Sequence, residues 1–436
     1  MMNYSLINKS LNAVSIELGI LYHLVSSPSC AQDPKILGYG IWPCNTAYLG
    51  PEKFQGRSSG CGYDEEGCLL STIGETAERY APTFYDDNEL LYASYNSLPV
   101  NTAAIHPDQI ALFHDEQFKL KGIQKILKLT PELEISWIPT VDLVNNKKVT
   151  YVPAQLIYLP FTKDDKWITY NTSTGLAAHT NYYKAILNAI FECIERDSFV
   201  LTWMQKIIAP KIIISEDIQQ YIDERFAAKC EWHFFDITYD LEIPTVFGIC
   251  FGESDYGSYV AVGSSTRATV GDALKKVILE IGQTAPYFRY VLGKKKEEKW
   301  EPTNDFSKVK NFEDHSAFYL KRKDLWHVFD DWRNAIPSKH INFHQSQELS
   351  DIGQILKCLE VFKNKGYNVL FKDITTPDIR QFGYYSIKVY IPQLIQMGGS
   401  YSWYFLGSPR LYTVPKQFGY TVNDFDNLNK YPHPFP

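Results

Sequence analysis

Apolar side chains recur at helical spacing along three stretches of the chain, and this pattern predicts helices near residues 65–80, 182–203 and 270–285. Each stretch follows a residue type that is common at helix N-caps, namely Asp64, Asn181 and Thr269. The apolar positions surround most of each helix, so the three helices are expected to be largely buried. Polar side chains within them therefore need hydrogen-bond or ionic partners.

Runs of β-branched and aromatic residues around these helices predict strands. The strands are expected at 133–144, 149–159, 232–238, 245–251, 259–264, 367–373 and 383–391. Asn145-Asn146 between the first two runs predicts a hairpin turn. Two further helices are expected at 315–334 and 348–365, with an exposed excursion over 293–315. Because strands and helices alternate, the pattern indicates an α/β (α+β) fold class.

Residues 1–50 show only short apolar runs, so they are expected to form an irregular N-terminal extension that packs on the core. Residues 51–436 are expected to form the main domain. Gly56–Gly67 is rich in glycine and polar residues, which predicts a loop leading into the first helix. A glycine loop that opens a helix can bind phosphate through backbone N–H groups. This loop lacks the Walker lysine pattern, so the signal is weak.

Two of the predicted helices share one polar pattern. It reads Ser71-x3-Glu75-x2-Glu78-Arg79 in the first helix and Asn188-x3-Glu192-x2-Glu195-Arg196 in the second. The third helix carries a weaker version, with Lys276, Glu280 and Gln283. Positions i, i+4 and i+7 lie on one face of a helix, so each helix presents a polar stripe. The repeated unit of strand, loop and helix indicates internal pseudo-symmetry within one domain.

The paired glutamates point to a bound cation. Two carboxylates one turn apart repel each other unless a positive charge lies between them. Oxygen ligands on one face suit Mg²⁺, which usually keeps waters and substrate phosphates as its other ligands. A structural alternative stays open, because Glu-x-x-Glu-Arg occurs on solvated helices and because Arg79 and Arg196 can pair with the glutamates. The recurrence of the pattern among apolar neighbours favours a site for a nucleotide with metal ions.

Composition and charge narrow the classes of partner. The 436 residues are 45% apolar and 21% charged, which is normal for a globular protein. The net charge of −7 argues against nucleic acid as the main partner. The sequence contains no apolar run of membrane-spanning length and no secretory signal pattern. Its eight cysteines form no C-x-x-C pair, so a zinc site has no support and a cytoplasmic location is expected.

The last six residues read Tyr431-Pro-His-Pro-Phe-Pro436. Prolines at alternate positions predict a stiff and extended tail close to polyproline II. A disordered tail is the alternative, since chain ends are often unordered.

These features together resemble the YcaO family. The resemblance rests on the two helix motifs, on Asn171-Thr-Ser-Thr-Gly-Leu-Ala-Ala178 before the second one, on Glu280-x2-Gln283 and on Pro432-x-Pro434-x-Pro436. It covers about residues 50–436, and Asp373–Ile379 and Val389–Pro392 are similar to the family's C-terminal region. It implies a YcaO-like fold of pseudo-symmetric sheet-and-helix units around a central ATP site.

The resemblance implies ATP and Mg²⁺ as cofactors. The residues that it assigns to the nucleotide site are Ser71, Glu75, Glu78, Asn188, Glu192, Glu195, Glu280 and Gln283. The metal ligands among them are Glu75, Glu78, Glu192, Glu195 and Glu280. The proline tail is similar to that of the azoline-forming branch, in which the terminal carboxylate, here that of Pro436, is expected to act as a base or orienting group. His433 is a second catalytic candidate, provided that the tail docks.

The implied activity is that of an ATP-dependent cyclodehydratase acting on a ribosomally made precursor peptide. Such an enzyme phosphorylates a backbone amide oxygen and converts Cys, Ser or Thr to a thiazoline or oxazoline, while Mg²⁺ spreads the charge of phosphoryl transfer. The implied partners are the precursor peptide, a separate E1-like leader-binding protein and a flavin-dependent azoline dehydrogenase. A homodimer within a larger complex is also implied.

Two alternative functions stay open. One is a related enzyme that forms a thioamide or amidine, against which the proline tail argues. The other is a non-catalytic scaffold, which gains support because Cys61 stands in the glycine loop where many family members carry lysine; Arg57 is the nearest cation. His179, before the second helix, is expected to be structural, and Trp203 is expected to pack in the core.

Overall fold

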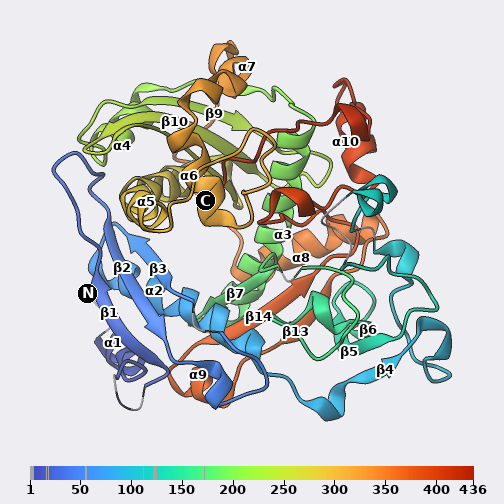
Figure 1. Cartoon of the computed structure of the whole chain (residues 1–436). Helices are drawn as coiled ribbons and strands as arrows, with labels where there is room; N and C mark the ends of the chain where they lie inside the picture. The colour runs from blue at the N-terminus through green and yellow to red at the C-terminus, as the bar shows by residue number, and fades with distance from the viewer. Residues whose placement is uncertain are drawn as a thin grey trace.

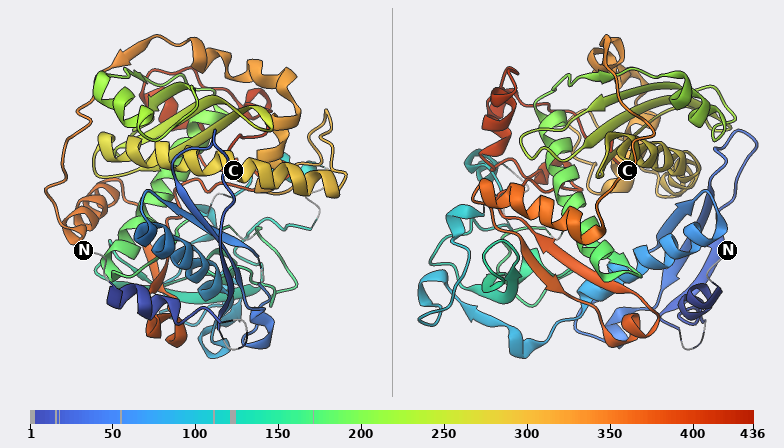
Figure 2. Two further views of the ribbon diagram at one scale, coloured as in Figure 1. Left: turned by 90° about the vertical axis from the view of Figure 1, so that its left-hand side faces the viewer. Right: turned by 180° about the vertical axis from the view of Figure 1, so that it is seen from behind.

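The chain folds into three sheets with long helices between them. The computed structural model describes residues 4–15, 17, 19–54, 56–110, 112–120, 125–170 and 172–436. The three long helices are α2 (Glu65–Tyr80), α3 (Tyr182–Met204) and α5 (Val270–Glu297), and the C-terminus lies near the middle of the molecule in every view (Figures 1 and 2). The arrangement confirms the predicted α/β (α+β) fold class. Asn171, in the motif before the second helix, lies outside the described residues.

The first sheet is built from the N-terminal part of the chain. It contains β1 (Leu21–Ser26), β2 (Leu37–Pro43) and β3 (Ser58–Gly62), paired antiparallel in that order, and α1 (Tyr4–Leu11) precedes it. The prediction that residues 1–50 are irregular was therefore wrong. The prediction of a loop over 56–67 was also wrong in part, because a strand occupies most of its first half.

Glycines in β3 let helix α2 approach the strand closely. A Cβ atom at Gly60 would overlap the backbone nitrogen of Thr72, and one at Gly62 would lie 2.6 Å from the backbone nitrogen of Cys68. Helix α2 begins where predicted, because the Asp64 carboxylate accepts a hydrogen bond of 2.7 Å from the backbone N–H of Gly67. The glycines thus allow close packing of the strand on the helix, whereas their abundance alone had predicted a loop.

The second sheet has six strands. They are β4 (Leu91–Ala93), β5 (Ile135–Asp142), β6 (Lys148–Pro153), β7 (Leu176–His179), β13 (Leu370–Asp373) and β14 (Tyr385–Tyr390). All pairs are antiparallel, and β14 joins β13 to β7. The predicted hairpin turn is confirmed, with Asn146 at φ 54° between β5 and β6. The strand predicted over 149–159 ends early, because a 3-10 turn covers Ala154–Leu156.

The third sheet has five strands. They are β8 (Lys211–Ile212), β9 (Glu231–Asp236), β10 (Thr245–Ser254), β11 (Gly257–Thr266) and β12 (Pro337–Lys339). β12 pairs parallel with β8, and the other pairs are antiparallel. The predicted strands over 232–238, 245–251 and 259–264 are confirmed with shifted ends.

The three long helices and the three sheets form a closed ring. Helix α2 packs on β3 and β7, α3 packs on β7 and β11, and α5 packs on β11 and β3. Each helix follows directly after a strand of a different sheet, so the strand–helix unit occurs three times. The sequence predicted this unit twice, with a weaker polar stripe on the third helix, and the described residues form the unit three times.

Several predictions between residues 285 and 334 were wrong. Helix α5 continues through Pro286 to Glu297, and its last turn carries the buried Lys295, whose ammonium pairs with Asp314 at 2.7 Å. The segment predicted as an exposed excursion is therefore anchored. In place of the one helix predicted over 315–334, the chain forms α6 (Phe312–Lys321), a 3-10 turn and α7 (Asp330–Asn334), because Arg322 leaves the helical conformation at φ −115° and ψ 58°.

The remaining helices lie on the outside of this ring. They are α4 (Glu216–Asp223), α8 (Asp351–Asn364), α9 (Pro377–Gln381) and α10 (Arg410–Gln417), of which only α8 was predicted. Trp203 is fully buried and stacks on Trp332 with ring centroids 5.5 Å apart, which confirms its place in the core. None of the helices in the described ranges is long and apolar enough to cross a membrane.

Candidate active site

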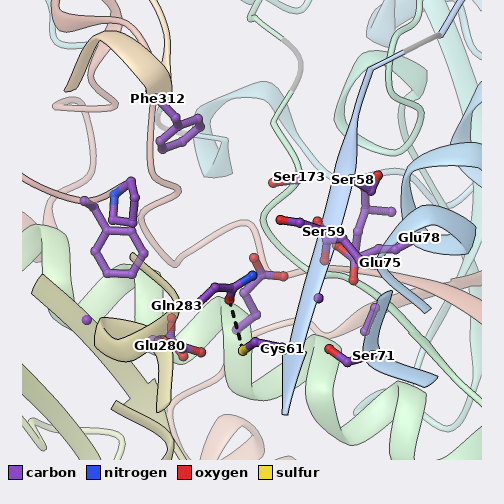
Figure 3. A pocket seen from close by; sticks show the side chains of 18 of the residues that line it. Ser58, Ser59, Cys61, Ser71, Glu75, Glu78, Ser173, Glu280, Gln283 and Phe312 are labelled. Atoms are coloured by element: carbon purple, nitrogen blue, oxygen red, sulfur yellow. Dashed lines mark hydrogen bonds between the residues drawn. The ribbon is translucent and has the colours of Figure 1, made fainter. Parts of the chain in front are cut away.

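An open cavity of about 640 Å³ lies at the centre of the ring formed by α2, α3 and α5. It is lined by all eight residues predicted for the nucleotide site: Ser71, Glu75, Glu78, Asn188, Glu192, Glu195, Glu280 and Gln283. Glu75 and Glu78 enter from the α2 side, and Glu280 and Gln283 enter from the α5 side (Figure 3). Three polar stripes that are far apart in the sequence thus converge on one space.

Each stripe pairs its glutamates with a cation on the same helix. On α2, Arg79 Nη2 lies 2.8 Å from Glu75 Oε1 and Nη1 lies 3.2 Å from Glu78 Oε1. On α3, the corresponding distances from Arg196 to Glu192 and Glu195 are 3.6 and 3.5 Å. On α5, Lys276 lies 3.3 Å from Glu280. The salt bridges considered as a structural alternative are therefore present, and they share the cavity with the proposed site.

These salt bridges leave the charges incompletely satisfied. Within the described part of the chain, the buried Nη1 atoms of Arg79 and Arg196 have no hydrogen-bond acceptor. Burial raises the pKa of Glu78 well above its usual value, and the charge of Glu75 raises it further. Burial also raises the pKa of Glu192, and it raises that of Glu195 to about 8. A divalent cation would relieve this carboxylate repulsion, and a phosphate would satisfy the arginine donors.

The donor set fits Mg²⁺ that is bound together with a phosphate. No three His, Cys, Asp or Glu side chains in the described ranges lie close enough to surround a metal ion by themselves. Mg²⁺ commonly takes one or two carboxylates and fills its octahedron with phosphate and water oxygens. The candidates for these carboxylates are Glu75, Glu78, Glu192, Glu195 and Glu280. The cavity therefore suits a metal–nucleotide complex better than a bare metal ion.

Backbone groups hold two of the glutamates in place. Glu192 Oε2 accepts a hydrogen bond of 3.1 Å from the backbone N–H of Gly175, and Glu195 Oε2 accepts one of 3.4 Å from Thr266. Gly175 has φ 81°, and a Cβ atom there would overlap the carbonyl oxygen of Val389. Only glycine fits this position, so the residue before β7 fixes where Glu192 points.

Lys388 on β14 was missed by the sequence analysis. Its side chain is buried behind the cavity, and Nζ donates a hydrogen bond of 2.6 Å to the carbonyl oxygen of Thr174. Burial lowers its pKa to about 8, opposed by the nearby charge of Glu192. A lysine between the apolar residues Ile387 and Val389 of a predicted strand was the signal that could have revealed it.

Cys61 connects β3 to α5 across the ring. Its thiol donates a hydrogen bond of 3.2 Å to Gln283 Oε1, and burial raises its pKa to about 11, so it is uncharged at neutral pH. Arg57, just before β3, lies over the rings of Trp42 and Tyr290, 5.1 and 4.6 Å from their centroids. Arg57 lines the cavity and forms no ion pair with any residue that the structure describes. It is therefore a cation available to a ligand.

The proline tail docks in the molecule, so the disordered alternative was wrong. Tyr319 donates a hydrogen bond of 2.7 Å to the carbonyl oxygen of Pro432, and the His315 ring donates one of 2.8 Å to that of His433. The Phe435 ring lies 4.4 Å beneath the guanidinium of Arg196. Pro436 reaches the central cavity. The terminal residue thus lies in the same space as the carboxylates.

His433 itself does not line the cavity. Its ring stacks on that of His315 with centroids 3.7 Å apart, and its Nε2 donates a hydrogen bond of 2.9 Å to the carbonyl oxygen of Gly398. Burial lowers its pKa to about 4, so it is neutral at physiological pH. These contacts support an anchoring role and give no support to His433 as a base. His179 Nδ1 accepts a hydrogen bond from the backbone of Asn181, as a structural histidine would.

Two grooves open from the central cavity. The tail-side groove, of about 850 Å³, lies among the loop over 397–405, the segment over 307–312 that leads into α6, and Tyr170. The hairpin-side groove, of about 600 Å³, lies between the β1–β2 hairpin and α5. Arg79, Ser173, Phe312 and Met397 line both the central cavity and the tail-side groove. Arg57, Ser59, Gly60, Cys61, Gln283 and Tyr287 line both the central cavity and the hairpin-side groove.

Comparisons with known proteins agree with this geometry. A family model described as YcaO cyclodehydratase, ATP- and Mg²⁺-binding, matches residues 59–395. A comparison with curated protein sequences gave no match. Among solved structures, a heterocyclase in complex with substrate and cofactor is 21% identical with a TM-score of 0.75, and the alignment covers 100% of this chain and 57% of that one. The chain thus spans little more than half the length of that heterocyclase.

Two further structures are similar along nearly their whole length. YcaO from Methanopyrus kandleri, bound with AMPPCP and Mg²⁺, is 13% identical with a TM-score of 0.61, over 93% of this chain and 94% of that one. The E. coli microcin synthetase McbBCD complex with pro-MccB17 bound includes a chain that is 15% identical with a TM-score of 0.59, over 97% and 98%. At these identities the likeness shows the fold. Because the family model spans most of the sequence, the chain belongs to the YcaO family, whose members bind ATP and Mg²⁺.

Proposed function

We propose that the protein is an ATP-dependent cyclodehydratase that forms thiazolines or oxazolines in a ribosomally made precursor peptide. The observation that carries the proposal is that Pro436 lies in the same cavity as the carboxylates of α2, α3 and α5. A terminal carboxylate beside a metal–nucleotide site provides a proton acceptor where a phosphoryl group is transferred. The proposal takes residues 51–436 as the catalytic domain and 1–50 as an extension of it.

Different residues of the chain are assigned to the metal ion, the nucleotide and its phosphates. Carboxylates from three helices would supply the ligands of Mg²⁺, and the candidates are Glu75, Glu78, Glu192, Glu195 and Glu280. Ser71, Asn188 and Gln283 offer hydrogen bonds to the nucleotide. The Nη1 groups of Arg79 and Arg196 have no hydrogen-bond acceptor among the described residues, and they are the donors for phosphate oxygens. When bound, Mg·ATP supplies the phosphoryl group that turns the amide oxygen into a leaving group.

The reaction forms one bond and removes one oxygen from the peptide. The side-chain sulfur or oxygen of Cys, Ser or Thr bonds to the preceding carbonyl carbon, and that carbonyl oxygen leaves as phosphate, giving a C=N bond. The thiol or hydroxyl proton and the amide proton must both be removed. The Pro436 carboxylate is the proposed acceptor, and the Phe435–Arg196 contact holds it at the cavity.

Partner proteins are part of the proposal. The solved complex of microcin synthetase with pro-MccB17 supports a precursor peptide as substrate and a partner protein. We infer an E1-like leader-binding partner, a flavin-dependent dehydrogenase acting on the product, a homodimer within the complex and a cytoplasmic location. Thioamide or amidine formation remains the second candidate reaction, since it would use the same phosphorylated amide, and a non-catalytic scaffold is the third candidate.

Calorimetric titration with Mg·ATP tests the nucleotide site. The native chain should bind, and a Glu75→Gln/Glu192→Gln variant should not. ATP hydrolysis that disappears in the variant would also exclude the scaffold. No binding by the native chain, alone or with a co-expressed partner, would overturn the proposal.

Removal of Pro436 tests the role of the tail. A variant lacking only this residue keeps the buried anchors around His433, so the fold should persist. We expect Mg·ATP binding within about twofold of native and a loss of cyclisation of at least about 100-fold, since general-base catalysis contributes 10²–10⁴-fold. Unchanged cyclisation would show that another group removes the proton.

A further inference from the structure

The tail-side groove is continuous with the proposed active site. Phe312, Met397 and Arg79 form a wall shared by the groove and the central cavity. Phe312 lies on the side of the cavity away from Ser71 (Figure 3). A chain lying in this groove would therefore enter the cavity on the side of α6 and the loop over 397–405.

The groove has aromatic and apolar walls. Tyr170 is 41% exposed, and its ring meets that of Trp403 edge-on with centroids 4.1 Å apart. Leu159 and Phe405 also line the groove, and Gly398 and Gly399 leave part of its wall without side chains. Such a surface suits a peptide that combines an apolar or aromatic side chain with main-chain hydrogen bonds.

The groove differs from the central cavity in charge, because the cavity is lined by five glutamates and five cationic side chains. No aspartate or glutamate in the described ranges lines the groove, whereas Arg79 and Lys310 do. Lys310 is exposed, and its ammonium forms no hydrogen bond or ion pair with the described residues. The groove therefore attracts acidic groups and repels basic ones.

The segments that form the groove also hold the tail. The carbonyl oxygen of Gly398 accepts the hydrogen bond from His433, and the Phe312 ring lies 5.9 Å from the His433 ring. A peptide in the groove would thus lie against the same loop and helix start that place Pro436 in the cavity. The occupant expected from this continuity is the precursor peptide whose residue reacts beside Pro436.

We propose that the tail-side groove binds the precursor segment next to the residue that is cyclised, and that it selects an aromatic or apolar residue with an acidic residue nearby while disfavouring basic ones. This inference rests on the proposed function and adds to it a substrate specificity. The nucleoside of ATP is the competing occupant. The hairpin-side groove suits a nucleoside better, because Trp42, Tyr287 and Tyr290 offer stacking surfaces there beside Arg57.

Photo-cross-linking locates the peptide. The probe is a short synthetic peptide with one cysteine and a benzoylphenylalanine beside it, incubated with the full chain and Mg·AMPPCP. Mass spectrometry should find the cross-links within 397–405 and 310–312. Cross-links within 25–29 or 286–290, or none at all, would overturn the assignment.

Charge reversal tests the selectivity. Two fluorescent peptides that differ only by Asp or Lys near the cysteine are titrated into the native chain and into Lys310→Glu. The native chain should bind the Asp peptide roughly twofold to fivefold more tightly, the range of an exposed ion pair, and the variant should invert this preference. Lys308→Glu is the matched control, because Lys308 is exposed two residues away and does not line the groove. An unchanged preference in Lys310→Glu would refute the specificity.

The same samples separate two kinds of failure. If the chain binds Mg·ATP but the peptide cross-links elsewhere, only the groove assignment is wrong. If Mg·ATP does not bind, with or without a partner, the proposed function itself fails.

Discussion

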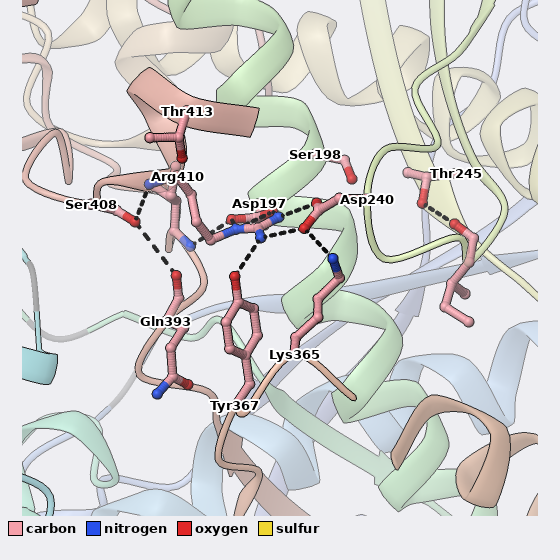
Figure 4. Close-up of polar contacts among 12 residues, drawn as sticks. Asp197, Ser198, Asp240, Thr245, Lys365, Tyr367, Gln393, Ser408, Arg410 and Thr413 are labelled. Atoms are coloured by element: carbon pink, nitrogen blue, oxygen red, sulfur yellow. Dashed lines mark hydrogen bonds and ion pairs between the residues drawn. The ribbon is translucent and has the colours of Figure 1, made fainter. Parts of the chain in front are cut away.

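Helix α3 carries two charged clusters side by side, and they differ in how completely they are satisfied. The closed cluster consists of Asp197, Arg410, Asp240, Lys365 and Tyr367 (Figure 4). Arg410 donates to both carboxylates at distances down to 2.6 Å and to the Tyr367 hydroxyl at 3.0 Å. The side chain of Asp197 is fully buried. None of these five residues lines the central cavity or either of its two grooves.

The open cluster consists of Arg196, the residue before Asp197, with Glu192 and Glu195. Arg196 lies 3.5 and 3.6 Å from its two glutamates, and its Nη1 lacks a hydrogen-bond acceptor in the described structure. Both clusters pair an arginine with carboxylates, and they meet on α3, where Arg196 is followed by Asp197. The completeness of their hydrogen bonding separates a structural ion cluster from a ligand site. Substitutions in the closed cluster should therefore mainly lower stability, whereas substitutions in the open cluster should mainly weaken ligand binding.

The largest effect is expected in the closed cluster. Arg410→Ala would leave the buried Asp197 without a cation and Asp240 with Lys365 alone, and it should lower stability by about 3–5 kcal/mol. Thermal unfolding measures the loss, and Arg410→Lys, which keeps the charge, should recover part of it. A thermal midpoint of Arg410→Ala equal to that of the native chain would mean that the closed cluster is not structural.

The tail beneath the open cluster should respond to acid. Burial in the docked state keeps the pKa of His433 at about 4, below the ordinary value of 6.5, and the charge of Arg196 lowers it further. The docking free energy is fully present above pH 6.5, and about 3 kcal/mol of it is lost as the pH falls toward 4, because only the undocked tail takes up the proton.

Carboxypeptidase release of the tail as a function of pH measures this loss. The His433→Phe variant should remove most of the pH dependence between 4 and 6.5, whereas the exposed His344, changed to Phe, should leave it intact. Equal pH profiles for the native chain and His433→Phe would contradict the assignment of this histidine.

In the corresponding cluster on α2, where Arg79 pairs with Glu75 and Glu78, Glu78→Gln should weaken Mg·ATP binding by about 100-fold, or about 2.7 kcal/mol. Its effect on stability should be within about 1 kcal/mol and favourable, since the substitution removes a buried charge that lies beside Glu75 and Glu192. Calorimetry and thermal unfolding of one sample give both values. Glu360→Gln on the exposed face of α8 should change neither. A large stability loss would place Glu78 with the structural cluster instead.

The smallest effect is expected at the rim of the closed cluster. Lys365 lies 2.9 Å from Asp240 and is 28% exposed. Because Arg410 already satisfies this aspartate, Lys365→Met should cost only about 1 kcal/mol in thermal or denaturant unfolding. Lys357→Met, at an exposed position of α8, is the control. An equal loss of stability in Lys365→Met and Arg410→Ala would show that the closed cluster depends on Lys365 as much as on Arg410.

The sequence revealed the site where polar stripes interrupt apolar helices. Ser71, Glu75 and Glu78 were recognisable because a helix places positions four and three apart on one face whatever the tertiary context. Residue type, an equally local signal, identified the N-caps of α2, α3 and α5. Convergence of these stripes on one cavity required the ring of sheets, which strand patterns alone do not specify.

The parts that were missed depend on contacts between distant segments. The strand β3 contains no β-branched residue, so its Ser-Ser-Gly-Cys-Gly sequence resembled a loop until α2 was seen to pack against Gly60 and Gly62. Docking of the tail depends on His315 and Tyr319, more than 100 residues earlier in the chain. Lys388 was missed because an apolar strand rarely carries a buried cation.

The ring of three helices also sets when the site can appear during folding. It closes only when β3 meets α5, and the hydrogen bond between Cys61 and Gln283 joins residues 222 positions apart. Contacts of such high sequence separation form late, because the entropy of closing the intervening chain must be overcome first. During synthesis, a nascent chain that already displays the glutamates of α2 and α3 still lacks the third wall of the cavity. The ability to bind nucleotide should therefore arise near the end of folding.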